Sequence, residues 1–334
     1  MSTMNLKEIK GFLKGEDDKT LFDEANEIRL QVFGKDVYLR GIIEFSNMCR
    51  EDCLYCGLRK SNRVLKRYRL TMEEILESAD LAKINNIKTI VLQSGDDLSY
   101  SKDFIGKLIE EIKTRFDVVI TLSLGERTYE EYAYWREKGA ERYLLKMETF
   151  DEKLYEKIRP GKRLKERLQR VEWLKELDYE VGSGIIVGLP WQDLDSLAKD
   201  LKRLTELELD MIAAGPFIPH PETPLRDYPH GDVDLSLRVI ALLRIMNPYA
   251  NIPATSALAS LHSDAREKGL KAGANVIMPS LTPKRVRLLY NIYPGKNESC
   301  QCVIDEINYI KGIIEKAGYI PSDSKGYSPR RLYA

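Results

Sequence analysis

The sequence predicts an α/β fold, a complete (β/α)8 TIM-type barrel with extra helices at its N- and C-terminal ends. Two observations lead to this prediction. Eight short runs rich in Val, Ile and Leu recur along the 334 residues, as buried parallel strands do. Amphipathic helical patterns lie between most of these runs. Strands that alternate with helices favour a barrel, and an open doubly wound sheet remains the alternative.

The predicted strands differ in length but share a high content of apolar residues. They are residues 37–46, 89–95, 118–125, 142–149, 182–190, 211–219, 251–258 and 275–280. The helical pattern after the first strand, "TMEEILESADLAKIN", opens with Thr71 and carries Glu74 three residues later, which is the capping box that starts many helices.

The eight repeats leave two further helices, at 4–33 and 302–317, outside the barrel. We therefore expect an N-terminal helical extension over 1–36, the barrel over 37–290 and a C-terminal helical extension over 291–334 that packs on the barrel.

Charge and composition reduce the number of function classes that the protein could belong to. The 52 Lys and Arg residues balance 52 Asp and Glu residues, which argues against a broad affinity for nucleic acid or an anionic membrane. The first 30 residues are charged and contain no apolar run, and no stretch approaches a membrane span. We expect a cytoplasmic protein, in which clustered cysteines are more often metal ligands than disulfides.

A barrel gathers its functional groups at the C-terminal ends of its strands. The first strand leads into "CREDCLYC", with Cys49, Cys53 and Cys56. The other strand ends also carry candidate residues, namely Ser94, Gly95, Ser123, Lys146, Met147, Glu148, Leu189, Pro219, Thr255, Ser256 and Met278.

The spacing C-x3-C-x2-C supplies three thiolates, which can hold three irons of a [4Fe–4S] cluster. The fourth iron then has no protein ligand, and an open coordination position marks a catalytic metal. The alternative is a zinc site completed by Cys300 or a histidine, in a barrel that binds a ligand without radical chemistry.

This spacing on the first loop of a barrel resembles the radical S-adenosylmethionine (SAM) enzymes. The resemblance implies that the open iron binds SAM and that an electron from the cluster cleaves SAM to a 5′-deoxyadenosyl radical. It also implies a set of SAM contacts: Tyr55 and the segments around Leu189 and Pro219 near adenine, Ser94 and Gly95 at the methionyl group, Glu148 and Arg167 at the ammonium and carboxylate, and Ser123.

Longer stretches, including "GIIEFSNMCREDCLYCGLRKSN", "TIVLQSGDD" and "GPFIPHPETPL", resemble the HydE family of [FeFe]-hydrogenase maturation enzymes. The resemblance implies a role in assembly of the diiron subcluster, on a cysteine-bound iron complex or a related thiol-type small substrate. It implies reduced ferredoxin or flavodoxin as electron donor and other hydrogenase maturases as candidate partners. An amino-acid mutase resembling methylornithine synthase is the alternative, and biotin synthase is more distant.

The sequence departs from that family at two places. The fourth strand ends in Lys146-Met147-Glu148-Thr149, where the family has Arg-His-Glu-Thr. Only Cys300 and Cys302 remain near the C-terminus, and they favour small residues at the start of the last helix over a second cluster. The substrate contacts that we expect are Lys146, Met147, Thr255, Ser256, Met278, Tyr290 and Tyr293.

Overall fold

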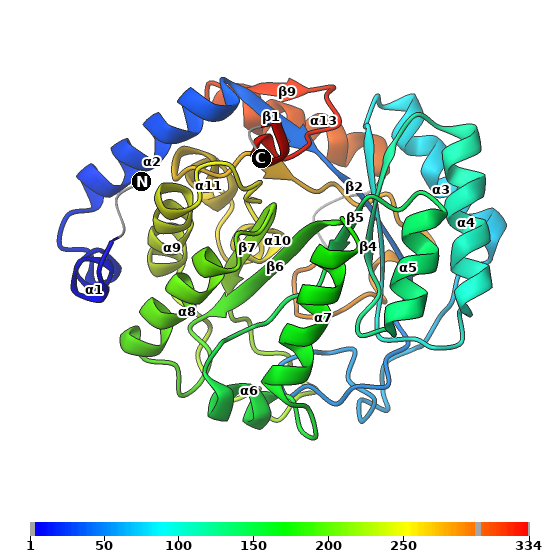
Figure 1. The fold of residues 1–334 in the computed structure, drawn as a ribbon, viewed down its shortest axis with the longest axis horizontal. Coiled ribbons are helices and arrows are strands. Elements are labelled where there is room, and N and C mark those ends of the chain that lie inside the picture. The colour runs from blue at the N-terminus through cyan, green and yellow to red at the C-terminus, as the bar shows by residue number, and fades with distance from the viewer. Residues whose placement is uncertain (1–3, 298–301, 333–334) are drawn as a thin grey trace.

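Six parallel strands form the main sheet of the protein, in a computed structural model that describes residues 4–297 and 302–332 (Figure 1). The strands follow one another in sequence order, and each pairs in parallel with the next. They are β2 (Gly41–Ser46), β3 (Thr89–Ser94), β4 (Val119–Ser123), β5 (Arg142–Leu144), β6 (Glu180–Val187) and β7 (Met211–Pro216).

Helices follow these strands in the chain and cover the outside of the sheet (Figure 1). They are α3 (Met72–Ile84), α4 (Lys102–Arg115), α5 (Tyr129–Glu137), α6 (Glu152–Ile158), α7 (Leu164–Glu176), α8 (Leu194–Glu206) and α9 (Val233–Met246). The predicted capping box of α3 is confirmed: Thr71 accepts from the Glu74 amide, and the Glu74 carboxylate accepts from the Thr71 amide.

A second, three-stranded parallel sheet has the order β8 (Val276–Ile277), β1 (Asp36–Leu39), β9 (Ile320–Ser322). Single bridges, not continuous ladders, connect the remaining segments. Met211 bridges Asn251, Pro253 bridges Val276, and Ile42 bridges Ser280. The prediction of an α/β fold with parallel strands is confirmed, whereas a complete eight-stranded barrel is not.

Three predicted strands differ from the structure. The run 37–46 is divided at the buried Arg40 between β1 and β2, which belong to different sheets. The run 251–258 gives way to α10 (Ser256–Leu261), which begins after Thr255, and Pro253 has no amide to donate to a strand ladder. The run 275–280 shortens to the two residues of β8.

The expected terminal helices are present. They are α1 (Leu6–Lys14), α2 (Asp18–Phe33) and α13 (Val303–Lys316), and the shorter α11 (Ala265–Lys271), α12 (Lys284–Arg287) and η1 (Pro329–Leu332) complete the fold. The C-terminal segment also contains β9, which the sequence did not indicate because its partner β1 lies far away in the chain. Within 4–297 and 302–332, no helix combines the length and the apolar character that a membrane span requires.

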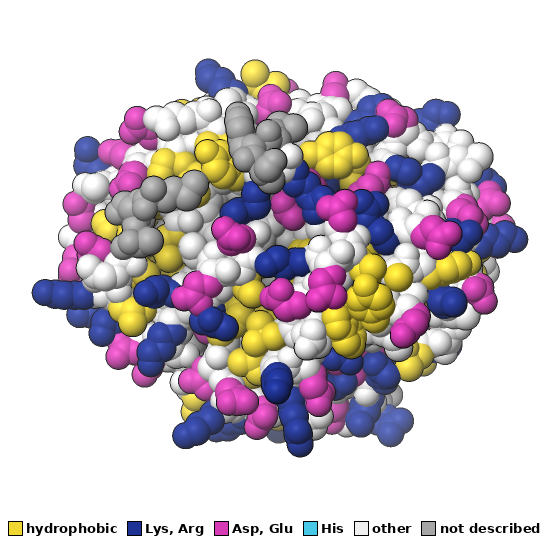
Figure 2. Space-filling view, in the orientation of Figure 1, with side chains coloured by type: hydrophobic (Ala, Val, Ile, Leu, Met, Phe, Trp, Pro, Cys, Tyr) yellow, Lys and Arg dark blue, Asp and Glu magenta, His cyan; other side chains and the backbone are white. Residues whose placement is uncertain are grey.

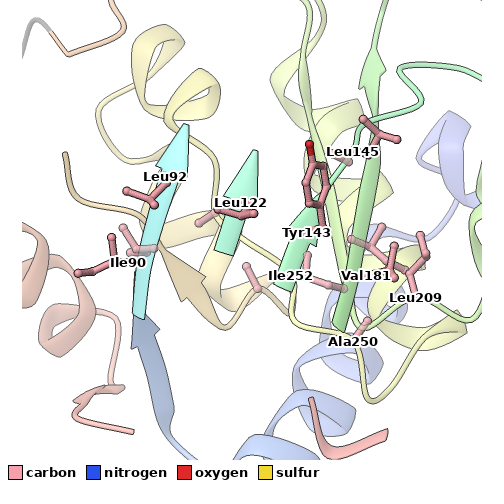
Figure 3. Close-up of a cluster of buried hydrophobic side chains, with 14 of the residues drawn as sticks. Ile90, Leu92, Leu122, Tyr143, Leu145, Val181, Leu209, Ala250 and Ile252 are labelled. Carbon is pink, nitrogen blue, oxygen red and sulfur yellow. The ribbon is translucent and has the colours of Figure 1, made fainter. Parts of the chain in front are cut away.

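Side chains of both charges are interspersed over the surface (Figure 2), and apolar side chains fill the space between strands and helices (Figure 3). Ile90, Leu92 and Leu122 are fully buried in this core. Because side chains alternate across a strand, Gln93, the neighbour of Leu92, points the other way and lines an internal cavity.

Candidate active site

The cysteine loop follows β2 and rests on the segment that follows β3. The Gly95 amide donates to the Ser46 carbonyl at 3.1 Å, and the Arg50 amide donates to the Asp96 carbonyl at 3.0 Å. The Asp96 amide in turn donates to Cys49 Sγ at 3.4 Å. Two neighbouring strand ends therefore hold the first cysteine in place.

Gly95 is needed for this close approach, because a Cβ atom there would lie 2.1 Å from the Met48 carbonyl oxygen. We expect Gly95→Ala to displace the cysteine loop and to lower the iron content of the protein several-fold while the circular dichroism spectrum stays unchanged. Gly312→Ala is the control, since a Cβ in that helix meets nothing within 4 Å. Equal iron content in the two variants would contradict the role assigned to Gly95.

The three cysteines lie in surroundings where their thiolates would need a positively charged partner. Cys53 is buried, Cys49 and Cys56 are partly buried, and all three line the same cavity. Burial raises the pKa of the Cys49 thiol to about 11 and also raises the pKa values of Cys53 and Cys56. Thiolates at these positions need a compensating positive charge, which an iron cluster provides.

The zinc alternative gains no support from the geometry. In the described part of the chain, no three His, Cys, Asp or Glu side chains are placed to hold one metal ion. A [4Fe–4S] cluster does not require the three thiolates to meet at one metal ion, because each cysteine binds a different iron.

Cys300 lies outside the described residues. Cys302 is the exposed N-cap of α13 and accepts from the Asp305 amide at 3.4 Å, so it does begin the last helix, although it is not packed in the core.

A cavity of about 340 Å³ is lined by the cysteine loop and by residues at the ends of the strands. Fifteen of the eighteen residues that the sequence singled out line it: Cys49, Cys53, Tyr55, Cys56, Ser94, Gly95, Ser123, Lys146, Glu148, Arg167, Thr255, Ser256, Met278, Tyr290 and Tyr293. Residues that are far apart in the sequence thus line one cavity, because the C-terminal ends of parallel strands lie at the same side of the sheet.

The other three residues lie elsewhere. Leu189 packs in a small apolar cluster against which Tyr55 also packs, and Pro219 follows Ile218, which does line the cavity. The expected place of Met147 needs correction, because its side chain is fully buried in the main core. Lys146 and Glu148, its neighbours on either side, line the cavity, whereas Met147 does not.

Glu148 and Arg167 both line the cavity, but each has its own partner. Glu148 has a φ of +68° and lies 3.1 Å from Lys146 Nζ, and the Tyr55 hydroxyl donates to it at 3.4 Å. Arg167 donates to the Lys146 carbonyl at 2.7 and 3.0 Å and to Glu126 at 2.9 Å. The two residues therefore flank Lys146 without an ion pair between them.

Glu126 organises the positive charge beside the cysteines. It lies 2.9 Å from Arg167, 3.3 Å from Lys162 and 3.4 Å from Arg159. Burial opposes ionisation of this carboxyl, but the three cations outweigh it and lower its pKa to about 2. Sequence reasoning missed Arg159, which is buried and lines the cavity, because nothing in the local pattern "KIRPGK" marks it.

Comparison with known proteins settles the family. The model of the Radical SAM superfamily matches residues 43–204. The [FeFe] hydrogenase maturase subunit HydE of Thermotoga maritima is 51% identical over 279 residues, which cover 84% of this chain and 80% of that protein. This chain belongs to the radical SAM superfamily. As a radical SAM enzyme it uses a [4Fe–4S] cluster and SAM.

Other radical SAM enzymes are also similar. The 3-methylornithine synthase of Methanosarcina acetivorans is 31% identical over 290 residues, 86% of this chain and 81% of that protein. The crystal structure of methylornithine synthase (PylB) superposes with a TM-score of 0.85 at 27% identity, over 96% of this chain and 95% of that one. The maturase HydG from Carboxydothermus hydrogenoformans, with a TM-score of 0.80 and 21% identity over 96% and 76% of the two chains, shares the fold.

The cavity of this radical SAM enzyme is polar at several points away from the cysteines. Gln93 Nε2 donates to the Tyr290 hydroxyl at 2.9 Å. The Thr255 hydroxyl is buried and has no hydrogen-bond partner among the described residues. Lys296, which the sequence did not single out, lines the cavity and pairs with the fully buried Glu44 on β2. Its partner lies 252 positions away, so no local pattern could reveal it.

Asp200 supports the segment that follows Glu148. This buried carboxylate on α8 accepts from the Phe150 amide at 2.7 Å and from the Thr149 hydroxyl at 3.0 Å. Burial raises its pKa to about 7. The folded protein therefore holds this proton more tightly than the unfolded chain does, so Asp200 favours folding most at acidic pH and loses that effect as pH rises from about 4 to 7.

We expect the free energy of unfolding to fall by up to about 4 kcal/mol over this range from Asp200 alone. In Asp200→Asn this part of the pH dependence should disappear, as measured by urea denaturation at several pH values between 4.5 and 7.5. Asp195→Asn, on the exposed side of the same helix, should keep the wild-type slope. An unchanged slope in Asp200→Asn would show that the carboxyl titrates normally.

Proposed function

We propose that this radical SAM enzyme acts in [FeFe]-hydrogenase maturation, on a cysteine-bound iron complex or a related thiol-type small molecule. The observation that carries the proposal is the 51% identity to a HydE maturase subunit over 84% of the chain. We also infer that the strands close into a complete (β/α)8 barrel, and the bridges of Asn251, Pro253 and Ser280 to neighbouring segments support this closure.

Cys49, Cys53 and Cys56 would hold three irons of the cluster, which supplies the electron that cleaves SAM to a 5′-deoxyadenosyl radical. The chain itself orients the reactants. Tyr55 and Glu148 lie on the cysteine side of the cavity, and we assign them to SAM together with Ser94, Gly95, Ser123 and Arg167. Thr255, Ser256, Met278, Tyr290 and Tyr293 would then contact the substrate, with Lys146 between the two groups.

Glu148 should hold the ammonium of SAM, because its carboxylate lines the cavity beside Tyr55. We expect Glu148→Gln to weaken SAM binding by about 1.5–3 kcal/mol, which is the usual contribution of a hydrogen bond to a charged group. Isothermal titration of the cluster-loaded protein would measure this. Glu156→Gln, exposed on α6, is the matched control and should bind SAM normally. Equal affinities in both variants would remove Glu148 from the SAM site.

The substrate class can be tested by adding this protein to a hydrogenase maturation mixture from which HydE has been omitted. Recovery of hydrogenase activity is the expected result, with reduced ferredoxin or flavodoxin as the electron source. The second candidate is the formation of a methylornithine-type product, which the similarity to PylB over nearly the whole of both chains favours. A mass-spectrometric screen of amino acids that found 3-methylornithine, with no hydrogenase recovered, would replace the first proposal by the second.

A further inference from the structure

A basic stretch of chain follows the cysteine loop directly. Residues 53–72 contain six Lys or Arg and no Asp or Glu, although the whole chain has zero net charge. Lys60, Arg63 and Lys66 from this stretch are exposed, and none of them forms an ion pair with any residue that the structure describes. Three positive charges are therefore available to a partner on one short loop.

Two side chains join this loop to the cysteines. Arg67 donates to the carbonyls of Leu58 and Arg59 at 2.9 and 2.7 Å. Asn62 donates to the carbonyl of Gly57, the residue after Cys56, at 2.8 Å and accepts from the Val64 amide at 3.2 Å. Hydrogen bonds thus connect Val64, through Asn62, to Gly57 at the end of the cysteine motif.

Apolar side chains lie among the charges. Val64 is 73% exposed and Leu288 is 61% exposed. Asn47 connects their segments, because its side-chain amide donates to the carbonyls of Lys66 and Leu289, both at 2.9 Å. Exposed apolar residues inside a charged rim are typical of a protein–protein interface. Figure 1 places the chain between β2 and α3 at the lower right of the molecule.

We propose that the basic surface formed by Lys60, Arg63, Val64, Lys66 and Leu288 docks an acidic one-electron carrier protein that reduces the cluster. The inference depends on the radical SAM chemistry of the chain and not on the identity of its substrate. The carrier, a reduced iron–sulfur or flavin protein, loses one electron, and the oxidised cluster gains it. No proton or group is transferred in this step.

Complementary charge mainly raises the rate of encounter, and salt screens it. In Lys60→Glu/Arg63→Glu/Lys66→Glu we expect reduction of the cluster by a stoichiometric acidic ferredoxin to slow by about tenfold or more at low ionic strength. The dissociation constant for the oxidised ferredoxin should rise by a similar factor. Both differences should shrink in 0.5 M salt. Stopped-flow absorbance of the cluster gives the rate, and titration calorimetry gives the affinity.

Two controls make the test specific. Lys7→Glu/Lys35→Glu/Lys199→Glu makes the same change in net charge at exposed lysines away from the cysteine loop, and it should be reduced at the wild-type rate. Sodium dithionite should reduce the cluster and support SAM cleavage equally in all proteins. If the charge-reversed protein does not fold, Lys60→Gln/Arg63→Gln/Lys66→Gln replaces it, with the same expected direction of change.

A flavodoxin used in place of the ferredoxin shows whether both kinds of carrier use the surface. The proposal is overturned if the variant accepts electrons from both carriers at the wild-type rate, or if the two triple variants are slowed equally. Failure of hydrogenase recovery would leave these rates unaffected, so the test is separate from that of the substrate.

Discussion

Replacement of any one of Cys49, Cys53 and Cys56 by alanine is expected to abolish cluster binding and cleavage of SAM, while the protein remains folded. Two remaining thiolates on this loop cannot hold a [4Fe–4S] cluster, and the next cysteine in the described chain, Cys302, is the exposed N-cap of α13. Iron content and formation of 5′-deoxyadenosine under anaerobic reducing conditions provide the measurements.

The fold should survive because the loop contributes little to the core. Cys49 and Cys56 only pack against the edge of the main core, which is formed by the strands and by the helices outside them. Cys302→Ala is the matched control and should keep the wild-type iron content. A wild-type rate of SAM cleavage in any of the three loop variants would refute the assignment of the ligands.

Lys296→Met is expected to cause a large loss of stability. Lys296 pairs with Glu44, which is fully buried on β2 and is also bound by the hydroxyls of Ser280 and Thr282. Burial opposes ionisation of Glu44, and Lys296 is the main group that offsets this and keeps the pKa of the carboxyl below its ordinary value. Loss of the cation leaves a buried charge without its partner, which typically costs about 3–5 kcal/mol.

Urea denaturation followed by circular dichroism would measure this loss. The double variant Glu44→Gln/Lys296→Met should recover much of the stability, because it removes the unpaired charge as well. Lys35→Met, at an exposed lysine, should have almost no effect. If Lys296→Met were as stable as Lys35→Met, the ion pair would contribute nothing to the fold.

The sequence by itself was enough to predict the alternation of strands and helices from β2 to β7, the cysteine loop and the helix cap at Thr71. Each of these depends on residues close together in the chain: apolar runs, periodic patterns, a capping pair and a ligand spacing. Residues at the ends of successive parallel strands, such as Cys49, Glu148 and Thr255, could also be assigned to one site, because such ends converge whatever the details of packing.

Only the tertiary structure decided what depends on contacts between distant segments. The partner of Arg167 is Glu126 rather than Glu148, and Lys296 reaches across the chain to Glu44. Met147 packs in the main core, while Lys146 and Glu148 on either side of it line the cavity. The strand β9 exists because β1 offers it a free edge. These contacts form between residues that are far apart in the sequence and close together only in the folded protein. Local sequence patterns therefore cannot predict them.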